Sequence, residues 1–510
     1  MSALQATDLI GVIGAGAMGS GIVQVALNAG HHVVLHDAAP AALDRGIASI
    51  ADAYQRLQAK GKIDEATRLD RLARLQRGAH LADLAKAALV IEAIVENIDI
   101  KARVLAEVEA LLAPNAIIAS NTSSLSVTAI AARLQRPQQV AGLHFFNPAP
   151  VLPLVEIVSG KVTAQAVADT LFATALAWGK VPVRCASTPG FIVNRVARPF
   201  YGEALRLLTE RAADVTAIDA ILRGSGGFRM GAFELMDLIG HDVNYAVTRS
   251  VYDALYSDAR YTPSLQQKEL VDAGWLGKKT GSGFYQYGAE AVNPAVPFAA
   301  LEAAPAAIVV EGDLGVAAPL AALAQAAGIA VNFVAGPGLL RIAGHAVALS
   351  DGRSATARYA ADADADVAVL FDLALDYAKA TTIAIACADQ APAGALAAVT
   401  GFFQALGKQV IVIDDASGMV VMRTVAMLAN EAAEVVQQGI ASVQDTDLAM
   451  VNGVNYPRGP LAWADTIGPA VLQRVLANLA ASYGEERYRS SPLLARRALT
   501  GQPFYREQAL

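Results

Sequence analysis

The stretch Asp8–Leu27, D-L-I-G-V-I-G-A-G-A-M-G-S-G-I-V-Q-V-A-L, decides the fold of this chain. A short apolar run leads into Gly14, Gly16 and Gly19, and a helical pattern follows directly. Glycines at this spacing permit a tight turn, close approach of the backbone to a pyrophosphate and packing of the helix against the strand. The first helical turn adds free N–H groups and a partial positive charge. The alternative is a glycine turn in an ordinary βαβ unit.

The next apolar run supports the dinucleotide interpretation. His32–Leu35 follows Gly30 and leads to Asp37, which lies 23 residues after Gly14. In a dinucleotide-binding unit a carboxylate about 20 residues after the first glycine accepts hydrogen bonds from the ribose hydroxyls. An acid at this position favours NAD over NADP, so we expect NAD as the cofactor.

Strand and helix patterns continue to alternate, which is typical of a doubly wound sheet. The expected elements are a helix over 41–59, a strand over 88–95, a helix over 99–112 and a strand over 116–119.

Polar residues follow two of these strands, where ligands of open α/β sheets bind. Glu96 and Lys101 follow one strand, and the cluster S-N-T-S-S at Ser120–Ser124 follows the other. The alternative for the cluster is a helix N-cap, because Ser and Thr are preferred there and a helix is expected over 127–134.

One histidine and one glutamate interrupt the apolar stretch Val140–Val158, V-A-G-L-H-F-F-N-P-A-P-V-L-P-L-V-E-I-V. Runs of this kind, bounded by Pro and Gly, read as two buried strands, with His144 at the end of the first and Glu156 inside the second. A lone carboxylate is costly inside an apolar strand, so we expect Glu156 to contact His144 and to orient it as a general base. The alternative is that His144 caps its strand and Glu156 faces solvent.

The chain contains an internal repeat at an offset of 228 residues, which matches Gly179-Lys180 with Gly407-Lys408. The same offset carries S-T-P-G-F-I-V-N-R onto D-A-S-G-M-V-V-M-R, which ends at Arg423. Other matched pairs are Glu203 with Glu431, Asp219 with Asp447, Gly231 with Gly459, Asp237 with Asp465 and Gly240 with Gly468. Residues 416–510 are therefore expected to be a second copy of a helical domain that could pack against its twin.

The second half lacks several of the polar features of the first. Its glycine turn keeps only Gly312 and Gly315, and Ala335 follows the strand expected over 330–334. Met422 replaces Asn194, which has its own alternative as a surface residue in the first turns of a long helix. We expect this half to bind a dinucleotide poorly.

The predicted fold class is α/β plus all-α, with a Rossmann-type doubly wound sheet, a helical domain, a degenerate Rossmann-like domain and a second helical domain. The expected boundaries are 1–187, 188–287, a linker over 288–306, 307–414 and 415–510.

Composition limits the classes of protein that fit. Of the 510 residues, 54% are hydrophobic and 17% charged, which gives ample material for large cores. No apolar run reaches the roughly 18 residues of a membrane span. The net charge of −7 argues against a general affinity for nucleic acid or anionic lipid. Two distant cysteines, Cys185 and Cys387, favour a reducing, cytoplasmic location, and we expect no metal site.

The motifs together resemble those of the 3-hydroxyacyl-CoA dehydrogenases, in the long bacterial form with two helical domains that is associated with phenylacetate breakdown and with 3-hydroxybutyryl-CoA. The resemblance covers nearly the whole chain. It rests on G-A-G-A-M-G-S-G-I, V-E-N, S-N-T-S-S, G-L-H-F-F-N-P, V-E, T-P-G-F-I-V-N-R and G-K-K-T-G-S-G-F-Y, in that order.

The resemblance implies NAD-dependent oxidation of a (3S)-3-hydroxyacyl-CoA thioester, with His144 as the base and Glu156 as its orienting partner. It implies that Ser123 and Asn194 hold the substrate oxygens. It also implies cofactor contacts, beyond the glycine turn and Asp37, from Met18, Glu96, Lys101, Ser123, Asn147 and Lys279. Lys60 and Lys62 are the residues we expect to contact coenzyme A phosphates.

One position departs from the family pattern: Arg229 stands where many relatives have Pro. A guanidinium is suited to a carboxylate, so Arg229 could receive the distal carboxylate of a substrate such as 3-hydroxyadipyl-CoA.

Two other functions stay open from the residues alone. One is a β-hydroxyacid dehydrogenase, which would use a lysine where Asn194 stands, and the other is a non-enzymatic NAD- or CoA-binding protein. The oligomeric state is open as well, with a homodimer among the choices.

Overall fold

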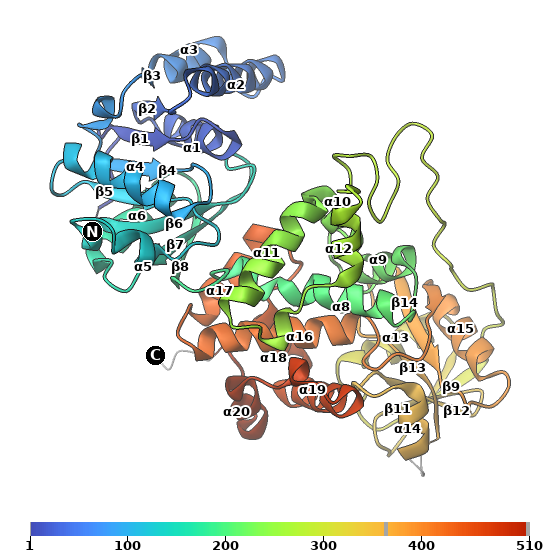
Figure 1. The fold of residues 1–510 in the computed structure, drawn as a ribbon. Helices are drawn as coiled ribbons and strands as arrows, with labels where there is room; N and C mark the ends of the chain where they lie inside the picture. Colours follow the sequence, from blue (N-terminus) through green and yellow to red (C-terminus); the bar gives the residue numbers. More distant parts are fainter. Residues whose placement is uncertain (1, 362–365, 506–510) are drawn as a thin grey trace. The chain divides into compact units, whose positions relative to one another are not determined.

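The computed structural model describes residues 2–361 and 366–505, whose contacts divide the chain into two units (Figure 1). The first unit contains the residues up to Arg195 together with Gln438–Val454. The second contains Val196–Gln437 and the residues from Asn455 onward. Each unit is built around its own sheet.

The sheet of the first unit has eight described strands in the order β3-β2-β1-β4-β5-β6-β7-β8. Strands β1 to β6 run parallel, β7 is antiparallel to β6, and β8 is parallel to β7. The bounds are β1 Ile10–Ile13, β2 Val33–His36, β3 Leu75–Gly78, β4 Leu89–Glu92, β5 Ile117–Ser120, β6 Val140–Phe145, β7 Leu154–Ser159 and β8 Val181–Ala186. This order confirms the predicted Rossmann-type sheet, and it places the carboxyl ends of β1, β4, β5 and β6 at one edge.

Helices cover both faces of this sheet (Figure 1). They are α1 Ala17–Asn28, α2 Pro40–Ala59, α3 Glu65–Ala73, α4 Ile98–Leu111, α5 Val127–Ala131 and α6 Gln165–Ala177, followed by the short α7 Val193–Val196. The sequence did not predict α3 or β3. Strand β3, L-Q-R-G, is mostly exposed at the sheet edge, so it lacks the apolar run that marks a buried strand.

The sheet of the second unit has seven strands in the described residues, in the order β10-β9-β11-β12-β13-β14-β15. Their bounds are β9 Ala307–Glu311, β10 Ala330–Val334, β11 Leu339–Ile342, β12 His345–Leu349, β13 Val367–Phe371, β14 Thr382–Cys387 and β15 Gln409–Val412. Helices α13 Pro319–Ala326, α14 Ala355–Ala361 and α15 Ala395–Ala405 accompany it. Strand β11 is antiparallel to both of its neighbours, so the doubly wound pattern is interrupted here.

The glycine turn of the second sheet is covered by backbone. A side chain at Gly312 would meet the carbonyl oxygen of Gly336 at 2.1 Å, and the Gly338 N–H donates to the carbonyl oxygen of Glu311. The loop that follows β10 therefore lies against the turn and occupies the space beside it.

Most of the remaining helices form the two copies of the helical domain. The first copy contains α8 Arg198–Thr209, α9 Val215–Gly224, α10 Ala232–Ile239, α11 His241–Ala254 and α12 Leu265–Asp272. The second contains α16 Val421–Gln437, α17 Val443–Val454, α18 Pro460–Ile467, α19 Pro469–Tyr483 and α20 Pro492–Thr500. Helices α8 and α16 pack directly against each other in the second unit, as expected for twinned domains.

The first helices of the two copies differ in continuity. The sequence predicted one long helix around Asn194, whereas the structure has α7 and then α8, divided at Ala197. Pro199 explains the break, because proline has no N–H to continue the helical hydrogen bonds. The second copy has Met427 at the matching position, and α16 runs unbroken.

The second helix of each copy packs on the sheet of the opposite half of the chain. Helix α9 contacts β14, where the Ser225 hydroxyl donates to the carbonyl of Thr382 over 2.5 Å. Helix α17 contacts β7 and β8, and the Ala186 N–H donates to the carbonyl of Ile440 just before α17. The first sheet is thus completed by a helix from the far end of the sequence.

Candidate active site

The glycine turn of the first unit has the geometry of a phosphate-binding turn. Gly14 has φ +103°, and a side chain there would meet the Ala93 carbonyl oxygen at 2.5 Å. A side chain at Gly19 would meet the Gly14 oxygen at 1.7 Å, so this glycine allows α1 to pack against the turn. Gly16 is exposed and has open space in front of it. A ligand can therefore approach the backbone at the start of α1, where free N–H groups attract anions.

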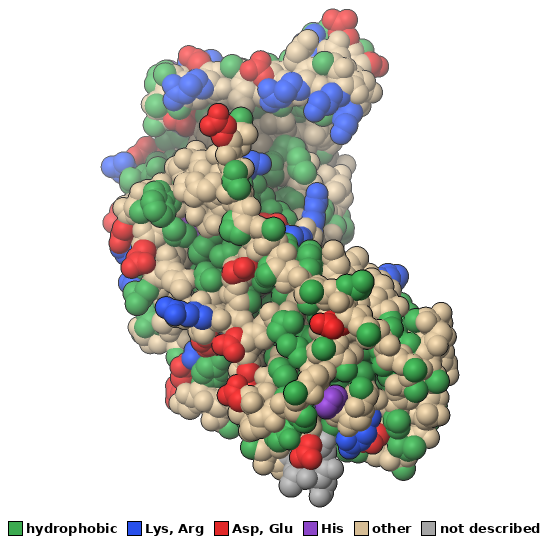
Figure 2. Space-filling view, turned by 90° about the vertical axis from the view of Figure 1, so that its right-hand side faces the viewer, with side chains coloured by type: hydrophobic (Ala, Val, Ile, Leu, Met, Phe, Trp, Pro, Cys, Tyr) green, Lys and Arg blue, Asp and Glu red, His purple; other side chains and the backbone are tan. Residues whose placement is uncertain are grey.

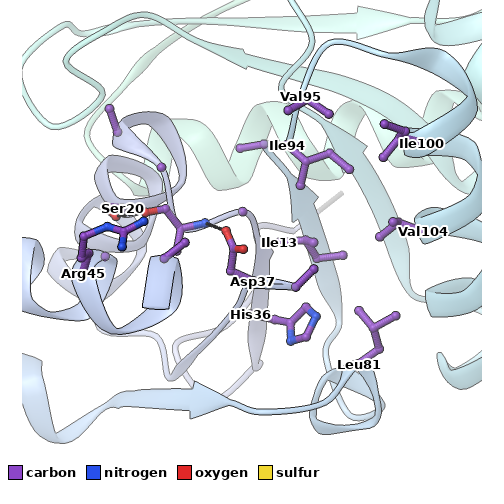
Figure 3. A pocket seen from close by; sticks show the side chains of 18 of the residues that line it. Ile13, Ser20, His36, Asp37, Arg45, Leu81, Ile94, Val95, Ile100 and Val104 are labelled. Atoms are coloured by element: carbon purple, nitrogen blue, oxygen red, sulfur yellow. Dashed lines mark hydrogen bonds between the residues drawn. The ribbon is translucent and has the colours of Figure 1, made fainter. Parts of the chain in front are cut away.

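A cavity of about 1040 Å³ opens beside this turn. One side carries Asp37, Arg45 and Ser20, and the facing side includes the apolar side chains of Ile94 and Val104 (Figure 3). Polar groups on one side and apolar side chains on the other suit a flat base joined to a ribose and a phosphate.

Asp37 lies in this cavity with both carboxylate oxygens engaged. Oδ2 accepts the Ala15 N–H over 2.8 Å (Figure 3), and Oδ1 accepts the Ala39 N–H over 2.9 Å. These bonds fix the carboxylate at the end of β2 beside the glycine turn. The glycines, the open space at Gly16 and this carboxylate together fit NAD.

A buried ion network closes the end of β4. Lys101 Nζ lies 2.6 Å from Glu92 Oε1 and 3.1 Å from Glu96 Oε2, and the Lys101 side chain is only 1% exposed. Lys101 therefore does not line the cavity that contains Asp37. Its ammonium forms ion pairs with both carboxylates, and such pairing is the condition under which buried charges are tolerated inside a protein.

Glu96 organises the loop after β5. Its Oε1 accepts hydrogen bonds from the backbone N–H groups of Ser123 and Ser124 and from the Thr122 hydroxyl. Partial burial raises the pKa of Glu96, but Lys101 and the hydroxyl donors outweigh this effect and hold its pKa below the ordinary value. The ionised carboxylate thus holds the S-N-T-S-S loop, and the half-buried Ser123 hydroxyl makes no hydrogen bond within the described residues.

His144 and Glu156 are directly opposite each other on β6 and β7. Nδ1 of His144 lies 2.6 Å from Glu156 Oε2, and both side chains are buried. An ionised carboxylate only accepts hydrogen bonds, so Nδ1 carries the proton and Nε2 is the nitrogen available to take another. The rings of Phe146 and Phe191 pack against the imidazole and restrict its orientation. The alternative in which Glu156 faces solvent is wrong.

Asn194 lies in α7, close in the chain to the residues that contact Glu156. The other oxygen of Glu156, Oε1, accepts the N–H groups of Ile192 and Val193, each over 3.0 Å. Asn194 is partly buried and belongs to the same unit as His144 and Ser123. The first unit therefore holds all four residues that the sequence singled out for chemistry.

Other predicted contacts lie elsewhere in the first unit. Met18 packs against the hydrophobic core instead of lining the cavity. Asn147 is exposed beyond the end of β6. Lys60 and Lys62 are exposed in the turn after α2. Lys and Arg side chains occur at several places on the surface shown in Figure 2.

Two predicted residues lie in the second unit. Lys279 is half exposed, and its Nζ lies 2.5 Å from Oδ1 of Asp242. Arg229 is exposed and makes no hydrogen bond or ion pair within the described residues.

The sequence missed several residues that shape the site. Arg45 and Arg103 line the cavity, but exposed arginines on helices carry no distinctive signal in one sequence. Asn121 Oδ1 accepts the Phe145 N–H over 2.8 Å and so fixes the end of β6 next to His144. Asn121 is the second residue of S-N-T-S-S, and the cluster could have pointed to it.

Three family models match the chain. The model described as "3-hydroxyacyl-CoA dehydrogenase, NAD binding domain" matches residues 9–188, and "3-hydroxyacyl-CoA dehydrogenase, C-terminal domain" matches both 190–287 and 418–507. The third, "3-hydroxybutyryl-CoA dehydrogenase reduced Rossmann-fold domain", matches 347–416.

Proteins similar in sequence include a 3-hydroxyadipyl-CoA dehydrogenase of Escherichia coli K12, 43% identical over 490 residues that cover 96% of this chain and 97% of the relative. A 3-hydroxybutyryl-CoA dehydrogenase of Clostridioides difficile is 38% identical over 278 residues, which cover 54% of this chain and 99% of the relative. A crystal structure of 3-hydroxybutyryl-CoA dehydrogenase from Escherichia coli K12 superimposes with a TM-score of 0.89 at 42% identity, covering 98% of this chain and 99% of that one.

Proposed function

The chain belongs to the 3-hydroxyacyl-CoA dehydrogenase family, and on this premise we propose how its residues carry out the reaction. The enzyme oxidises a 3-hydroxyacyl-CoA reversibly to the 3-oxoacyl-CoA with NAD. NAD, when bound, supplies the acceptor for the hydride from C3. The buried His144–Glu156 pair is the observation that carries the proposal.

His144 acts as the general base. Nε2 takes the proton of the C3 hydroxyl as the C–H bond breaks, and Glu156 stabilises the imidazolium that forms. In the reverse direction the same nitrogen returns the proton to the oxygen. Because Nδ1 is already bonded to Glu156, the imidazole needs no change of tautomer before it acts.

Ser123 and Asn194 hold the substrate oxygens. A hydroxyl and an amide N–H can donate to the C3 oxygen and to the thioester carbonyl. These hydrogen bonds fix C3 and its hydroxyl relative to His144. The support is that both side chains lie in the same unit as the His–Glu pair. We propose the (3S) configuration at C3 because the resemblance to the family implies it.

The natural substrate in this proposal carries a second carboxylate at the far end of its acyl chain, as in 3-hydroxyadipyl-CoA. The 43%-identical relative is named for that substrate. Arg229 is a charged, exposed side chain with no internal partner among the described residues, and a guanidinium matches a carboxylate in a bidentate pair. The second helical copy has Pro457 at the matching position.

The second half serves as a scaffold in this proposal, without turnover of its own.

The described residues contain no helix long and apolar enough to cross a membrane. We also propose a cytoplasmic location, which the few cysteines favour. Lys60 and Lys62 contact coenzyme A phosphates in this proposal, and the full chain forms a homodimer.

Kinetics with His144→Ala test the proposal. We expect kcat to fall about a thousandfold, within the range for loss of a general base, while the Kd for NADH stays nearly unchanged. His345→Ala, in the second half, is the matched control and should keep full activity. Unchanged turnover in His144→Ala would show that His144 is not the general base.

The substrate class needs its own measurement. We expect Arg229→Ala to lower kcat/KM for 3-oxoadipyl-CoA by about tenfold or more, the loss typical of a charged hydrogen bond, and to leave 3-oxobutyryl-CoA and 3-oxohexanoyl-CoA unaffected. Arg229→Lys keeps the charge and should lose less. An equal loss of kcat/KM for all three thioesters would show that Arg229 does not bind the distal carboxylate.

A further inference from the structure

Glu156 makes two separate sets of contacts with its two oxygens. Oε2 accepts from Nδ1 of His144, whereas Oε1 accepts the N–H groups of Ile192 and Val193. The second contact lies at the start of α7, the turn that carries Asn194. One buried carboxylate therefore touches both the base and the segment that presents the substrate-holding amide.

The second half of the chain shows the same helix start without a histidine. The offset of 228 residues places Asp372 at the position of His144 and Ala384 at that of Glu156. The pairing is preserved in the backbone, because the Asp372 N–H donates to the Ala384 carbonyl over 3.0 Å. The base and its partner have thus been replaced by an aspartate and an alanine.

Asp372 nevertheless binds the helix start that corresponds to the target of Glu156. Its carboxylate accepts the N–H groups of Val420, Val421 and Met422 over 3.0, 2.7 and 2.9 Å. These residues match Ile192, Val193 and Asn194 in the first half. The carboxylate comes from the neighbouring strand, yet it meets the same backbone groups.

The physical reason is the helix N-terminus itself. The first N–H groups of a helix have no partner within the helix and carry a partial positive charge, and here they are buried. An ionised carboxylate satisfies both needs. Because the second half keeps such a carboxylate where no imidazole has to be oriented, the contact with the helix start has a function separate from the contact with His144.

We propose that Glu156 is a positioning residue for Asn194 in addition to its contact with His144. By holding the N–H groups of Ile192 and Val193, it fixes the direction of α7 and so the place of the Asn194 amide. The inference rests on the proposed role of Asn194 in holding substrate oxygens. It predicts that loss of Glu156 weakens substrate binding even when His144 is absent.

The test uses the full-length enzyme in a His144→Ala background, where the orienting contact no longer exists. The measured quantity is the Kd for 3-oxobutyryl-CoA by isothermal titration calorimetry. We expect H144A/E156A to bind about tenfold more weakly than H144A, as for the loss of hydrogen bonds to a charged group. H144A/E156Q should bind within about twofold of H144A, because the glutamine oxygen can still accept both N–H groups.

Removal of Asn194 separates positioning from a general loss of structure. In H144A/N194A, the further change E156A should leave the Kd unchanged, because the amide to be positioned is gone. Glu156→Leu, which fills the space without an acceptor, repeats the test if the alanine variant does not fold, and NADH binding checks the fold of each variant. Asp372→Ala, which uncaps the second copy, should lower the thermal midpoint and leave the Kd unchanged.

Three results would overturn the inference. The first is an unchanged Kd when E156A is added to H144A. The second is a loss of affinity that persists in the absence of Asn194, and the third is a loss that glutamine at position 156 does not rescue. Failure of the proposed function gives a different result, namely full turnover by His144→Ala alone.

Discussion

Arg487 in the second helical copy donates from Nε to Oε1 of Glu203 in the first copy over 2.9 Å. Arg423, also in the second copy, donates to the other oxygen over 2.6 Å. The reverse contact joins Arg260 of the first copy to Glu431 of the second over 3.4 Å. Since Glu203 and Glu431 are matched by the repeat, the two copies exchange equivalent ion pairs, as the subunits of a symmetric dimer would.

This exchange predicts how stability depends on pH. Burial raises the pKa of Glu203, but Arg487 and Arg423 outweigh burial and lower it to about 2. A carboxyl group with a lower pKa in the folded chain stabilises the fold above its unfolded pKa, and that stabilisation is lost as the pH falls toward the folded value. We expect about 3 kcal/mol at neutral pH from this group, lost between about pH 4.5 and pH 2.

Glu203→Gln tests this prediction by thermal unfolding across the acid range. The variant should be less stable at neutral pH, because two buried arginines lose their carboxylate, and its midpoint should vary less with pH below about pH 5. Glu302→Gln, at an exposed position, is the control and should keep the dependence of the wild type. A variant curve parallel to that of the wild type would contradict the assignment to Glu203.

The packing of helix α17 predicts an effect on the candidate active site. A side chain at Gly453 would meet Leu154 Cδ2 at 2.6 Å and Val193 Cγ2 at 3.0 Å. Val193 directly precedes Asn194, so a bulkier residue at Gly453 should displace α7. We expect Gly453→Val to lower kcat/KM by about tenfold or more, in line with overpacking costs of about 1–3 kcal/mol. Val451→Ala, on the exposed face of the same helix, should have no effect, and equal activity of the two variants would exclude this role of α17.

The repeat explains why much of the fold could be predicted from the sequence. Several of the matched residues serve the fold in both copies. Lys180 donates to the carbonyls of Ala149 and Leu152 in the loop between β6 and β7, and Lys408 donates to those of Ala378 and Ala380 in the loop between β13 and β14. Asp237 and Asp465 each accept two N–H groups from a Phe-Tyr pair near the end of their copy, at Phe284-Tyr285 and at Phe504-Tyr505. Because each of these side chains binds backbone groups that both copies contain, the same residue type is found at matched positions of the two copies.

Features that depend on distant contacts could not be predicted. The packing of α17 on β7 and β8 joins segments more than half the chain apart, and no local pattern encodes it. Lys101 was expected at the cofactor because it follows a strand end, yet its partners Glu92 and Glu96 bury it. The function of Asp372 became visible only when the structure showed which N–H groups its carboxylate accepts.

Asp37 predicts the preference between the two nicotinamide cofactors. A carboxylate in this cavity accepts ribose hydroxyls and repels the additional phosphate of NADP. We expect Asp37→Ser to raise the Kd for NADH by about tenfold, as for the loss of charged hydrogen bonds, and to lower the Kd for NADPH. Fluorescence titration of both cofactors measures this, with Asp44→Ser on the exposed face of α2 as the control. An unchanged ratio of the two Kd values would show that Asp37 does not set the preference.

The two sheets predict that one chain binds one NADH. Gly16 opens onto a cavity in the first unit, whereas the turn at Gly312 in the second is covered by the backbone at Gly336. Calorimetric titration of the full chain should therefore saturate at a single equivalent. Gly14→Ala, which forces a side chain against the Ala93 carbonyl at a positive φ, should abolish all of the binding. Saturation at two equivalents, or half of the binding retained by Gly14→Ala, would mean that the second sheet also holds a dinucleotide.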